Sequence, residues 1–409
     1  MLWSRRGLMA EKNFMRSTGL LDQCARAVKY CGARVISHVA QMACSRFGIE
    51  GNTVLFESFL GKRLDCNPKA IYDFLREEYP GKYRYIWVAE RPSDWIDLYG
   101  SEDTEVVRFR SADHLKYACI ANVLITNSPR SNELPFPKSQ LKIQTWHGGG
   151  CYKKVGTALN EGAPVNRFIT SRQFAQYDYF ISSSSFFSQT VARGHYRFTG
   201  NLLECGMPRN DRLVNGDEIG RRSIRTALGL AESDCFVLFV PTWRDFGDDL
   251  PCLDVRGVKR AFERLGGSNA VMAKRGHYFS GRQQGSFDMD LDDYPDMQGL
   301  LLAADAVITD YSSVIWDYSF TYRPCFLFAP DLAKYEVDRG FDVDIHEWGF
   351  PVCESNEELI AAIDKFDERG FRSAMETHHA QLGSFEKGHA CETVAKLIET
   401  HCFGNEEKE

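Results

Sequence analysis

The chain has 409 residues, of which 44% are hydrophobic and 26% are charged, and its formal net charge is −7. This length exceeds what one ordinary core supports and predicts two domains, while the near-average composition excludes a disordered or fibrous protein. The thirteen cysteines form no CxxC pair and their number is odd, which favours a reducing compartment over a disulfide framework. The sequence has no run of about 18 uncharged apolar residues and no cleavable leader, so a cytoplasmic protein is expected.

The first 50 residues are expected to form a basic amphipathic helical segment. Up to residue 48, lysines and arginines outnumber acidic residues by six. The apolar side chains that recur at helical spacing are Leu20, Cys24, Val28, Cys31, Val35, Val39 and Met42. Such a helix can associate with an anionic membrane surface, and it equally fits an ordinary surface helix that docks on the first domain. The sequence leaves both interpretations open.

From residue 51 onward, short apolar runs alternate with helical stretches, which is typical of a mostly parallel sheet. The expected strands are 53–59, 85–90, 123–128, 142–147 and 179–184 in the first half, and 235–243, 270–276, 306–312 and 325–330 in the second. The expected helices are 67–79, 255–265 and 297–304. A polar stretch at 214–222 divides these into two doubly wound domains, 51–215 and 216–400. In such sheets ligands bind at the carboxyl ends of the strands, in a cleft where two sheets face each other.

The stretch TWHGGG ends a strand of the first half. His147 follows Trp146 there, and the glycines from Gly148 and Gly149 onward let backbone amides approach an anion. A histidine can act as a general base near neutral pH. The alternative is a structural histidine in a glycine turn.

Three strand ends of the second half also carry polar residues. PTWRD places Pro241 and Thr242 at one end, and KRGHY places Arg275, Gly276 and His277 at another. The cations of the second stretch suit an anionic ligand such as phosphate, although solvated or paired surface charges would look the same.

The third strand end lies in TDYSSVIWDYS. Asp310, Ser312 and Ser313 follow the strand and precede a helical stretch, whose free amides suit a phosphate, while Asp317 lies one turn further and can accept bonds from polyol or ribose hydroxyls. Simple N-capping of the helix is the alternative. Arg209, in GMPRND between the domains, is a candidate clamp for a pyrophosphate or a partner of Asp211.

Two further signals carry no site prediction. The acidic run 288–296 lacks the glycine and the glutamate of a calcium loop and is expected to be a solvated loop. His378, His379, His389 and His401 are expected to be surface residues.

Taken in order along the chain, these stretches resemble the CDP-glycerol glycerophosphotransferase family, the teichoic acid primases and polymerases. The motifs that carry the resemblance are ESFLGK, NPKAIY, QTWHG, GMPRND, PTWRD, the Arg-x-His stretch, YPDMQGLLLAADAVITDYSS and the downstream Asp317. They cover roughly residues 51 to 395, and their combination is far more specific than any one of them.

The resemblance implies a GT-B architecture, with an acceptor-binding first domain and a donor-binding second domain. It implies an enzyme that transfers glycerol phosphate from CDP-glycerol to a polyprenyl-diphosphate-linked acceptor and releases CMP, in the synthesis of teichoic acid or a related envelope or capsule polymer. Ribitol phosphate from CDP-ribitol is the alternative donor. The enzyme would work as a peripheral protein on the cytoplasmic face of the membrane. No nucleic acid partner is expected.

Carried over residue by residue, His147 resembles the catalytic base, with Trp146 and Gly148 beside it. The residues that resemble the donor-binding set are Arg209, Pro241, Thr242, Arg275, Gly276, His277, Ser312, Ser313 and Asp317, and His277 is also a candidate for the chemistry. Because arginines and helical amides can neutralise the phosphate charge, no metal is demanded, and magnesium bound with the pyrophosphate stays open.

The sequence departs from the family pattern at two points. GGG follows the histidine where Gly-Thr-Pro is usual, and Met207 stands where an aromatic residue is common. Two other functions also stay open at this stage, a GT-B glycosyltransferase that uses a nucleotide sugar and a non-enzymatic relative that binds lipid-linked polymer.

Overall fold

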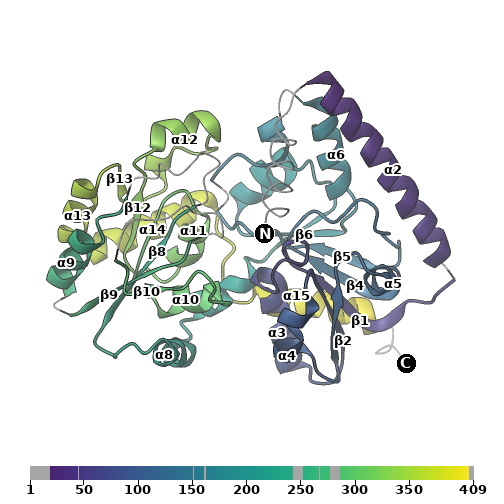
Figure 1. The fold of residues 1–409 in the computed structure, drawn as a ribbon, viewed down its shortest axis with the longest axis horizontal. Helices are drawn as coiled ribbons and strands as arrows, with labels where there is room; N and C mark the ends of the chain where they lie inside the picture. The colour runs from purple at the N-terminus through teal and green to yellow at the C-terminus, as the bar shows by residue number, and fades with distance from the viewer. Residues whose placement is uncertain are drawn as a thin grey trace. The chain divides into compact units, whose positions relative to one another are not determined.

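The computed structural model describes residues 19–44, 46–150, 152–160, 163–242, 252–266, 268–276 and 286–404 (Figure 1). Within these residues the chain divides into two compact units. Unit 1 is drawn from Met1–His147, Val155–Arg209 and His389–Glu409, and unit 2 from Gly148–Lys154 and Asn210–Gly388. Each unit is built around one parallel sheet.

The sheet of unit 1 has seven strands in the order β3-β2-β1-β4-β5-β6-β7, and every pair of neighbours is parallel. The strands are β1 (Glu50–Glu57), β2 (Arg84–Ala89), β3 (Thr104–Arg108), β4 (Ala121–Thr126), β5 (Leu141–Gln144), β6 (Tyr179–Ser182) and β7 (Asn201–Glu204). The middle of the sheet is buried on both faces and mainly apolar there, as Val54, Leu55 and Phe56 of β1 and Leu124 and Ile125 of β4 show. The order reverses between β1 and β4, which makes their carboxyl ends the expected ligand site of this unit.

The helices of unit 1 are α2 (Leu20–Cys44), α3 (Cys66–Glu78), α4 (Ile96–Tyr99), α5 (Ala112–Ile120), α6 (Pro164–Phe174) and α15 (Ala390–Phe403), with a π-helical segment at Phe187–His195 and short 3-10 turns at Phe59–Gly61, Pro92–Asp94, Gly156–Asn160 and Pro208–Asn210. Helix α3 illustrates what stabilises these helices. The carboxylate of Asp65 caps its first turn by accepting from the Cys66 amide at 2.6 Å. Ile71 and Leu75, one turn apart, bury its apolar face.

The sheet of unit 2 has six parallel strands in the order β10-β9-β8-β11-β12-β13, which is the same doubly wound arrangement. The strands are β8 (Cys235–Val240), β9 (Ala270–Lys274), β10 (Met289–Asp290), β11 (Ala306–Thr309), β12 (Cys325–Phe328) and β13 (Val352–Cys353). The helices are α7 (Asp211–Asn215), α8 (Glu218–Ala227), α9 (Val255–Gly266), α10 (Met297–Ala303), α11 (Val314–Ser319), α12 (Leu332–Asp338), α13 (Asn356–Asp364) and α14 (Glu368–Leu382), with a 3-10 turn at Ile345–Glu347. Here the order reverses between β8 and β11.

The N-terminal helix α2 presents its apolar stripe to solvent. It packs alongside α6 and α5 of unit 1 through a face that includes Gln23, Arg26 and Ser37 (Figure 1). The opposite face exposes Leu20, Leu21, Val28, Val35, Ile36, Val39 and Met42, each at 55% or more. The amphipathic helix predicted from the sequence is therefore present, and it docks by its more polar side. The lysines and arginines before residue 19, which were counted in the predicted basic segment, lie outside the described residues. No helix among the described residues combines the length and the apolar character needed to cross a bilayer.

The expected domain boundaries differ from the observed division in three places. Gly148–Lys154 belongs to unit 2, unit 2 resumes at Asn210 rather than at 216, and the chain returns to unit 1 at His389 rather than ending in the second domain. The return is explained by α15, which packs on α3 and β1 and buries Val394 and Ile398.

Cys44 and Cys119 form one disulfide that joins α2 to α5, with their Cα atoms 5.5 Å apart, while the other ten described cysteines are not disulfide-bonded. Three expectations about smaller features were wrong. The run 288–296 is not only a solvated loop, since β10 pairs with β9 and Asp288, Asp290 and Asp292 bind lysines on α9 and β9. His378 and His379 are 2% and 8% exposed, because their face of α14 packs inward.

Candidate active site

His147 lies three residues past β5, with its ring fixed by the end of the neighbouring strand β4. The ring atom Nδ1 is 2.9 Å from the backbone oxygen of Asn127. Because a carbonyl oxygen can only accept, Nδ1 carries the proton, and Nε2 of the neutral ring keeps its lone pair. This tautomer is the one that a general base acting through Nε2 needs.

Asn127 is itself held at the reversal point of the sheet. Its side-chain amide donates to the Ser58 hydroxyl at 3.1 Å, and its side-chain oxygen accepts from the Phe59 amide at 2.8 Å. Ser58 and Asn127 directly follow β1 and β4, so the carbonyl that orients His147 is anchored to both central strands. Asn127 was not among the residues predicted from the sequence, although it directly follows the strand β4.

Trp146 acts in the structure as a packing residue that shapes the turn before His147. Its indole is 8% exposed and lies 4.8 Å from the Tyr196 ring and 6.1 Å from the Phe174 ring, measured between centroids. Its φ angle is +53°, a conformation that bulky residues rarely adopt. The Trp146 amide donates to the Gln144 side chain at 2.9 Å, which helps to hold this strained backbone.

The glycines after His147 meet aromatic rings of unit 2. A Cβ added to Gly149 would lie 2.1 Å from Cδ1 of Trp316, and one added to Gly150 would lie 2.6 Å from the Tyr152 ring. Gly148 is buried as well. Close packing of rings against the backbone therefore accounts for two of the three glycines, where the sequence suggested an approach to an anion.

Arg209 lies in unit 1 against the first turn of α3. The side chain is 6% exposed, and Nη1 donates to the sulfur of Cys66 at 3.0 Å. Burial raises the pKa of the Cys66 thiol, and the nearby arginine opposes that rise. The Arg209 backbone amide donates to Oδ1 of Asn67 at 3.2 Å, so the arginine and the start of α3 are fixed together.

In unit 2 the predicted residues gather at the carboxyl ends of three adjacent strands. Thr242, two residues past β8, donates its backbone amide to both carboxylate oxygens of Asp310 at 2.9 Å and also donates its hydroxyl. Asp310 directly follows β11 and also accepts from the Tyr311 amide. Asp310 thus ties the ends of β8 and β11 together next to Pro241, at the reversal point of this sheet.

The end of β9 completes this group. The Arg275 side chain is 5% exposed and donates to the Tyr294 carbonyl at 2.8 Å, and the Gly276 amide donates to Asp292 at 2.7 Å. Lys274 pairs with Asp290 and Asp292, so its charge is already compensated. His277, with Arg244 and Asp245 of PTWRD, lies outside the described residues.

The serines and Asp317 lie at α11. Ser313 precedes the helix, and the Ser312 hydroxyl accepts from the Val314 amide at 3.4 Å. Asp317 is 4% exposed and accepts from Nε2 of Gln298 at 3.2 Å, a partner that the sequence gave no reason to expect. Among the described residues, no group of three or more metal-ligating side chains has the arrangement to hold an ion.

Comparisons with known proteins agree with this geometry. Residues 38–400 match the sequence family CDP-glycerol:poly(glycerophosphate) glycerophosphotransferase. The chain is 28% identical over 368 residues to the teichoic acid poly(glycerol phosphate) polymerase of Bacillus spizizenii W23, covering 84% of this chain and 91% of that one. It is 30% identical to the polymerase of the same name from Staphylococcus epidermidis RP62A, covering 86% of this chain but only 51% of that longer protein.

The wall teichoic acid polymerase TagF provides the structural comparison. A histidine-to-asparagine variant of that polymerase, soaked with CDPG for 30 minutes, superposes with a TM-score of 0.75 at 26% identity, covering 96% of this chain and all of that one. The two doubly wound units are therefore of the GT-B type predicted from the sequence. The chain belongs to the CDP-glycerol:poly(glycerophosphate) glycerophosphotransferase family.

Proposed function

We propose that this chain transfers glycerol phosphate from CDP-glycerol to a lipid-linked acceptor and releases CMP, with His147 as the general base. Membership of the family supports the reaction class. The observation that carries the assignment of the base is the bond between Nδ1 of His147 and the carbonyl of Asn127 at 2.9 Å, which leaves the lone pair on Nε2. A strand-end histidine held in this tautomer is what proton abstraction from a hydroxyl requires.

In the proposed reaction, the acceptor hydroxyl loses its proton to Nε2 of His147 and its oxygen attacks the phosphorus that bears glycerol. A new oxygen–phosphorus bond forms, the bond from that phosphorus to the bridging oxygen breaks, and CMP leaves. The protein contributes mainly positioning and charge stabilisation in such transfers. In unit 2 we assign Thr242, Arg275, Gly276, Ser312 and Ser313 to binding the donor. In unit 1 we assign Arg209 to contacting a phosphate group.

The test is CMP release from CDP-glycerol and, separately, from CDP-ribitol, with a short-chain analogue of a lipid-linked acceptor. Acceptor-dependent release is expected from CDP-glycerol. His147→Ala should lower kcat by roughly 10²- to 10⁴-fold while the Kd for CDP-glycerol stays near that of wild type. His346→Ala, at an exposed histidine of unit 2, is the control.

Full turnover in His147→Ala would remove His147 from the reaction. Preference for CDP-ribitol would reassign the polyol. Release of a sugar nucleotide's UDP in place of CMP would point to a glycosyltransferase. The same assay in EDTA tests the expectation that no metal ion is required.

We also propose that α2 places the enzyme on an anionic membrane surface, where a lipid-linked acceptor would reside. The support is the contiguous apolar face that includes Leu21, Val28, Val35 and Val39, each more than half exposed. Burying such a face in the interface stabilises the bound state by roughly 25 cal/mol per Å² of apolar area. Exposed Lys29 and Arg46 add attraction to anionic lipids.

Sedimentation with phosphatidylglycerol vesicles tests this surface. The double variant Val28→Asp with Val35→Asp should lose most vesicle binding, because it places two charges in the apolar face. The control is Ile219→Asp with Val337→Asp, which changes two apolar residues of unit 2 that are even more exposed than Val28 and Val35. Undiminished binding by the α2 variant would move membrane association elsewhere in the chain.

A further inference from the structure

The side chain of Asn67 joins the two segments that carry His147 and Arg209. It is fully buried and is the second residue of α3. Its Nδ2 atom donates to the carbonyl oxygens of Thr145 at 3.1 Å and Trp146 at 3.0 Å, and its Oδ1 atom accepts from the backbone amide of Arg209 at 3.2 Å. One carboxamide therefore bonds to backbone segments that are 78 and 142 residues away in the sequence.

The start of α3, which carries Asn67, is also held by contacts of the neighbouring residue Cys66. The carboxylate of Asp65 accepts from the amide of Cys66, and Nη1 of Arg209 donates to the sulfur of Cys66. Cys66 has a φ angle of +69°, so the chain enters α3 through a sharply constrained turn. The carboxamide is thereby presented to the strand-end turn at a set position and orientation.

The turn that Asn67 contacts needs such support. Trp146 adopts a φ angle of +53°, a strained conformation that persists only where surrounding contacts impose it. Its carbonyl also accepts from the Thr145 hydroxyl at 3.1 Å. His147 is the next residue, so relaxation of this backbone would change the direction of its ring.

We propose that Asn67 is a positioning residue that holds the His147 turn and the Arg209 segment in the geometry used for phosphoryl transfer. The expected effect of Asn67 on turnover rests on the proposed function. Its expected effect on the orientation of the His147 ring does not. Only a side chain with a short amide can donate to both carbonyls and accept from Arg209 at this distance. Aspartate, the isosteric replacement, has no hydrogen to donate and places a negative charge against two carbonyl oxygens.

Turnover of Asn67→Asp and Asn67→Ala provides the first test. Each variant should lower kcat for CMP release by roughly 10- to 100-fold, because a displacement of about 1 Å at a catalytic group can cost that much. Asn122→Asp is the matched control, since Asn122 is also a buried asparagine of unit 1 that donates to a backbone carbonyl, that of Gly51 at 2.7 Å, but at the amino end of β4. The control should keep kcat within about twofold at a comparable loss of Tm.

The second test is independent of turnover. In ring-labelled histidine NMR, the His147 signal is assigned by its loss in His147→Gln and is expected to report the Nδ1-protonated tautomer in wild type. Asn67→Ala should shift that signal and its titration, and Asn122→Asp should not. If wild type releases no CMP from CDP-glycerol, the proposed function fails, while this comparison still decides the role of Asn67. Asn67 variants with wild-type kcat and an unchanged His147 signal, or with losses that merely follow Tm as in the control, would overturn the proposal.

Discussion

At the scale of single residues, Gly149 shows how packing can fix a residue type next to a catalytic candidate. The glycine lies against the indole of Trp316, which is fully buried and donates from Nε1 to Glu386 at 2.9 Å. The ring is therefore anchored and has little room to move away from an added methyl group. Packing within unit 2 therefore favours glycine at position 149, whatever this residue also does for substrate.

Gly149→Ala is expected to destabilise the protein by about 1–3 kcal/mol, the usual cost of overpacking a core, because its Cβ would lie 2.1 Å from the indole. Gly51→Ala is the control, since a Cβ at Gly51 has nothing within 4 Å. Denaturant unfolding of the two variants and wild type measures the difference. Equal midpoints for both variants would show that Trp316 yields at little cost.

The buried pair His378 and His379 predicts how stability depends on pH. The pKa of each ring is lowered to about 4, mainly by burial and, for His379, also by the charge of the neighbouring His378. The unfolded rings titrate near pH 6.5, so the unfolded chain binds more protons between about pH 6.5 and pH 4. The contribution of the pair is therefore complete above about pH 6.5 and is lost as the pH falls towards 4, on the order of 1–3 kcal/mol per histidine.

Unfolding free energies between pH 4 and pH 7 test this dependence. The double variant His378→Gln with His379→Gln should show a flatter slope than wild type over that range, even if its stability is lower throughout. His346→Gln, at an exposed histidine, should keep the wild-type slope. Parallel slopes for wild type and the double variant would contradict the burial argument.

Some residues of the site could be predicted from their local sequence, whereas others owe their role to contacts with segments far away in the sequence. His147, Thr242 and Asp310 could be found because each follows an apolar strand, and parallel strand ends meet at one edge of a sheet. The bonds of Asn67 to Thr145 and Arg209 could not, because they join segments 78 and 142 residues apart whose approach only the folded chain defines. The histidines of α14 were misjudged because helical spacing alone does not say which face packs inward.

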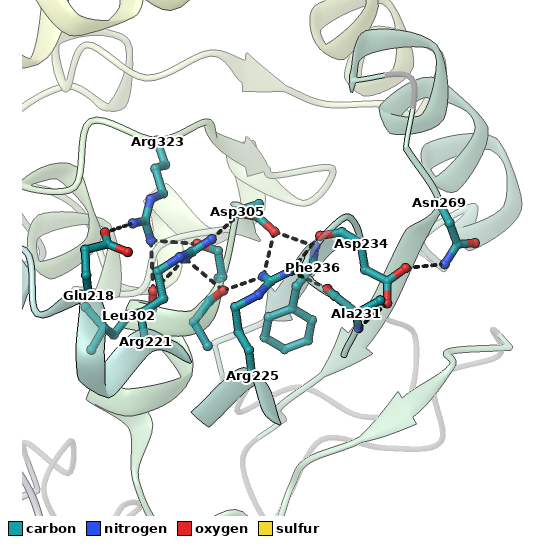
Figure 2. Close-up of polar contacts among 12 residues, drawn as sticks. Glu218, Arg221, Arg225, Ala231, Asp234, Phe236, Asn269, Leu302, Asp305 and Arg323 are labelled. Carbon is teal, nitrogen blue, oxygen red and sulfur yellow. Dashed lines mark hydrogen bonds and ion pairs between the residues drawn. The ribbon is translucent and has the colours of Figure 1, made fainter. Parts of the chain in front are cut away.

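At the scale of elements, the end of α10 shows how arginines replace a C-terminal cap. The last carbonyls of this helix, at Leu302, Ala303 and Ala304, accept from Arg221 of α8, and Arg225 and Arg323 add further bonds (Figure 2). Asp305 pairs with Arg221 and Arg225. The free carbonyls at the helix end thus accept hydrogen bonds from two arginines of α8 and from Arg323, whose positive charges also oppose the negative end of the helix dipole.

Arg225→Met is expected to lower stability by about 2–3 kcal/mol, because it removes a buried guanidinium that pairs with Asp305 and donates to backbone carbonyls. Arg225 is 7% exposed and bonds to Ala303, Asp305, Ala231 and Asp234. Arg222→Met is the control on the same helix, where the side chain is exposed. The two variants are compared by thermal unfolding, and equal Tm values would show that the carbonyls find other donors.

The sequence predicted the central strands of both sheets well and missed strands at their edges. β4, β8, β11 and residues 53–57 of β1 are mainly apolar and buried on both faces, which is a strong signal. By contrast, β10 and β13 have only two residues each, which is too short to show the apolar run or the alternation that predicts a strand. Their pairing depends on β9 and β12 already being in place.

At the scale of the whole molecule, the chain is not two consecutive domains. After completing unit 2, it returns through α15 to cover α3 and β1 of unit 1. Glu399 pairs with Lys82, and His401 lies 3.0 Å from the side chain of Asn122. The boundary predicted from the sequence placed α15 in the second domain, because the amphipathic pattern of this helix does not indicate which unit its apolar face packs against.

This return predicts that the C-terminal segment stabilises the unit that carries His147. A chain ending at Gly388 loses the buried contacts of Val394 and Ile398, so β1 and β2 should lose protection in amide hydrogen exchange while β8 and β11 keep theirs. A chain ending at Gly404 retains all of α15 and is the control. Protection lost first in β8 and β11 would mean that α15 supports unit 2 instead. Since His147 is held by Asn127 at the end of β4, CMP release should fall together with the protection of unit 1.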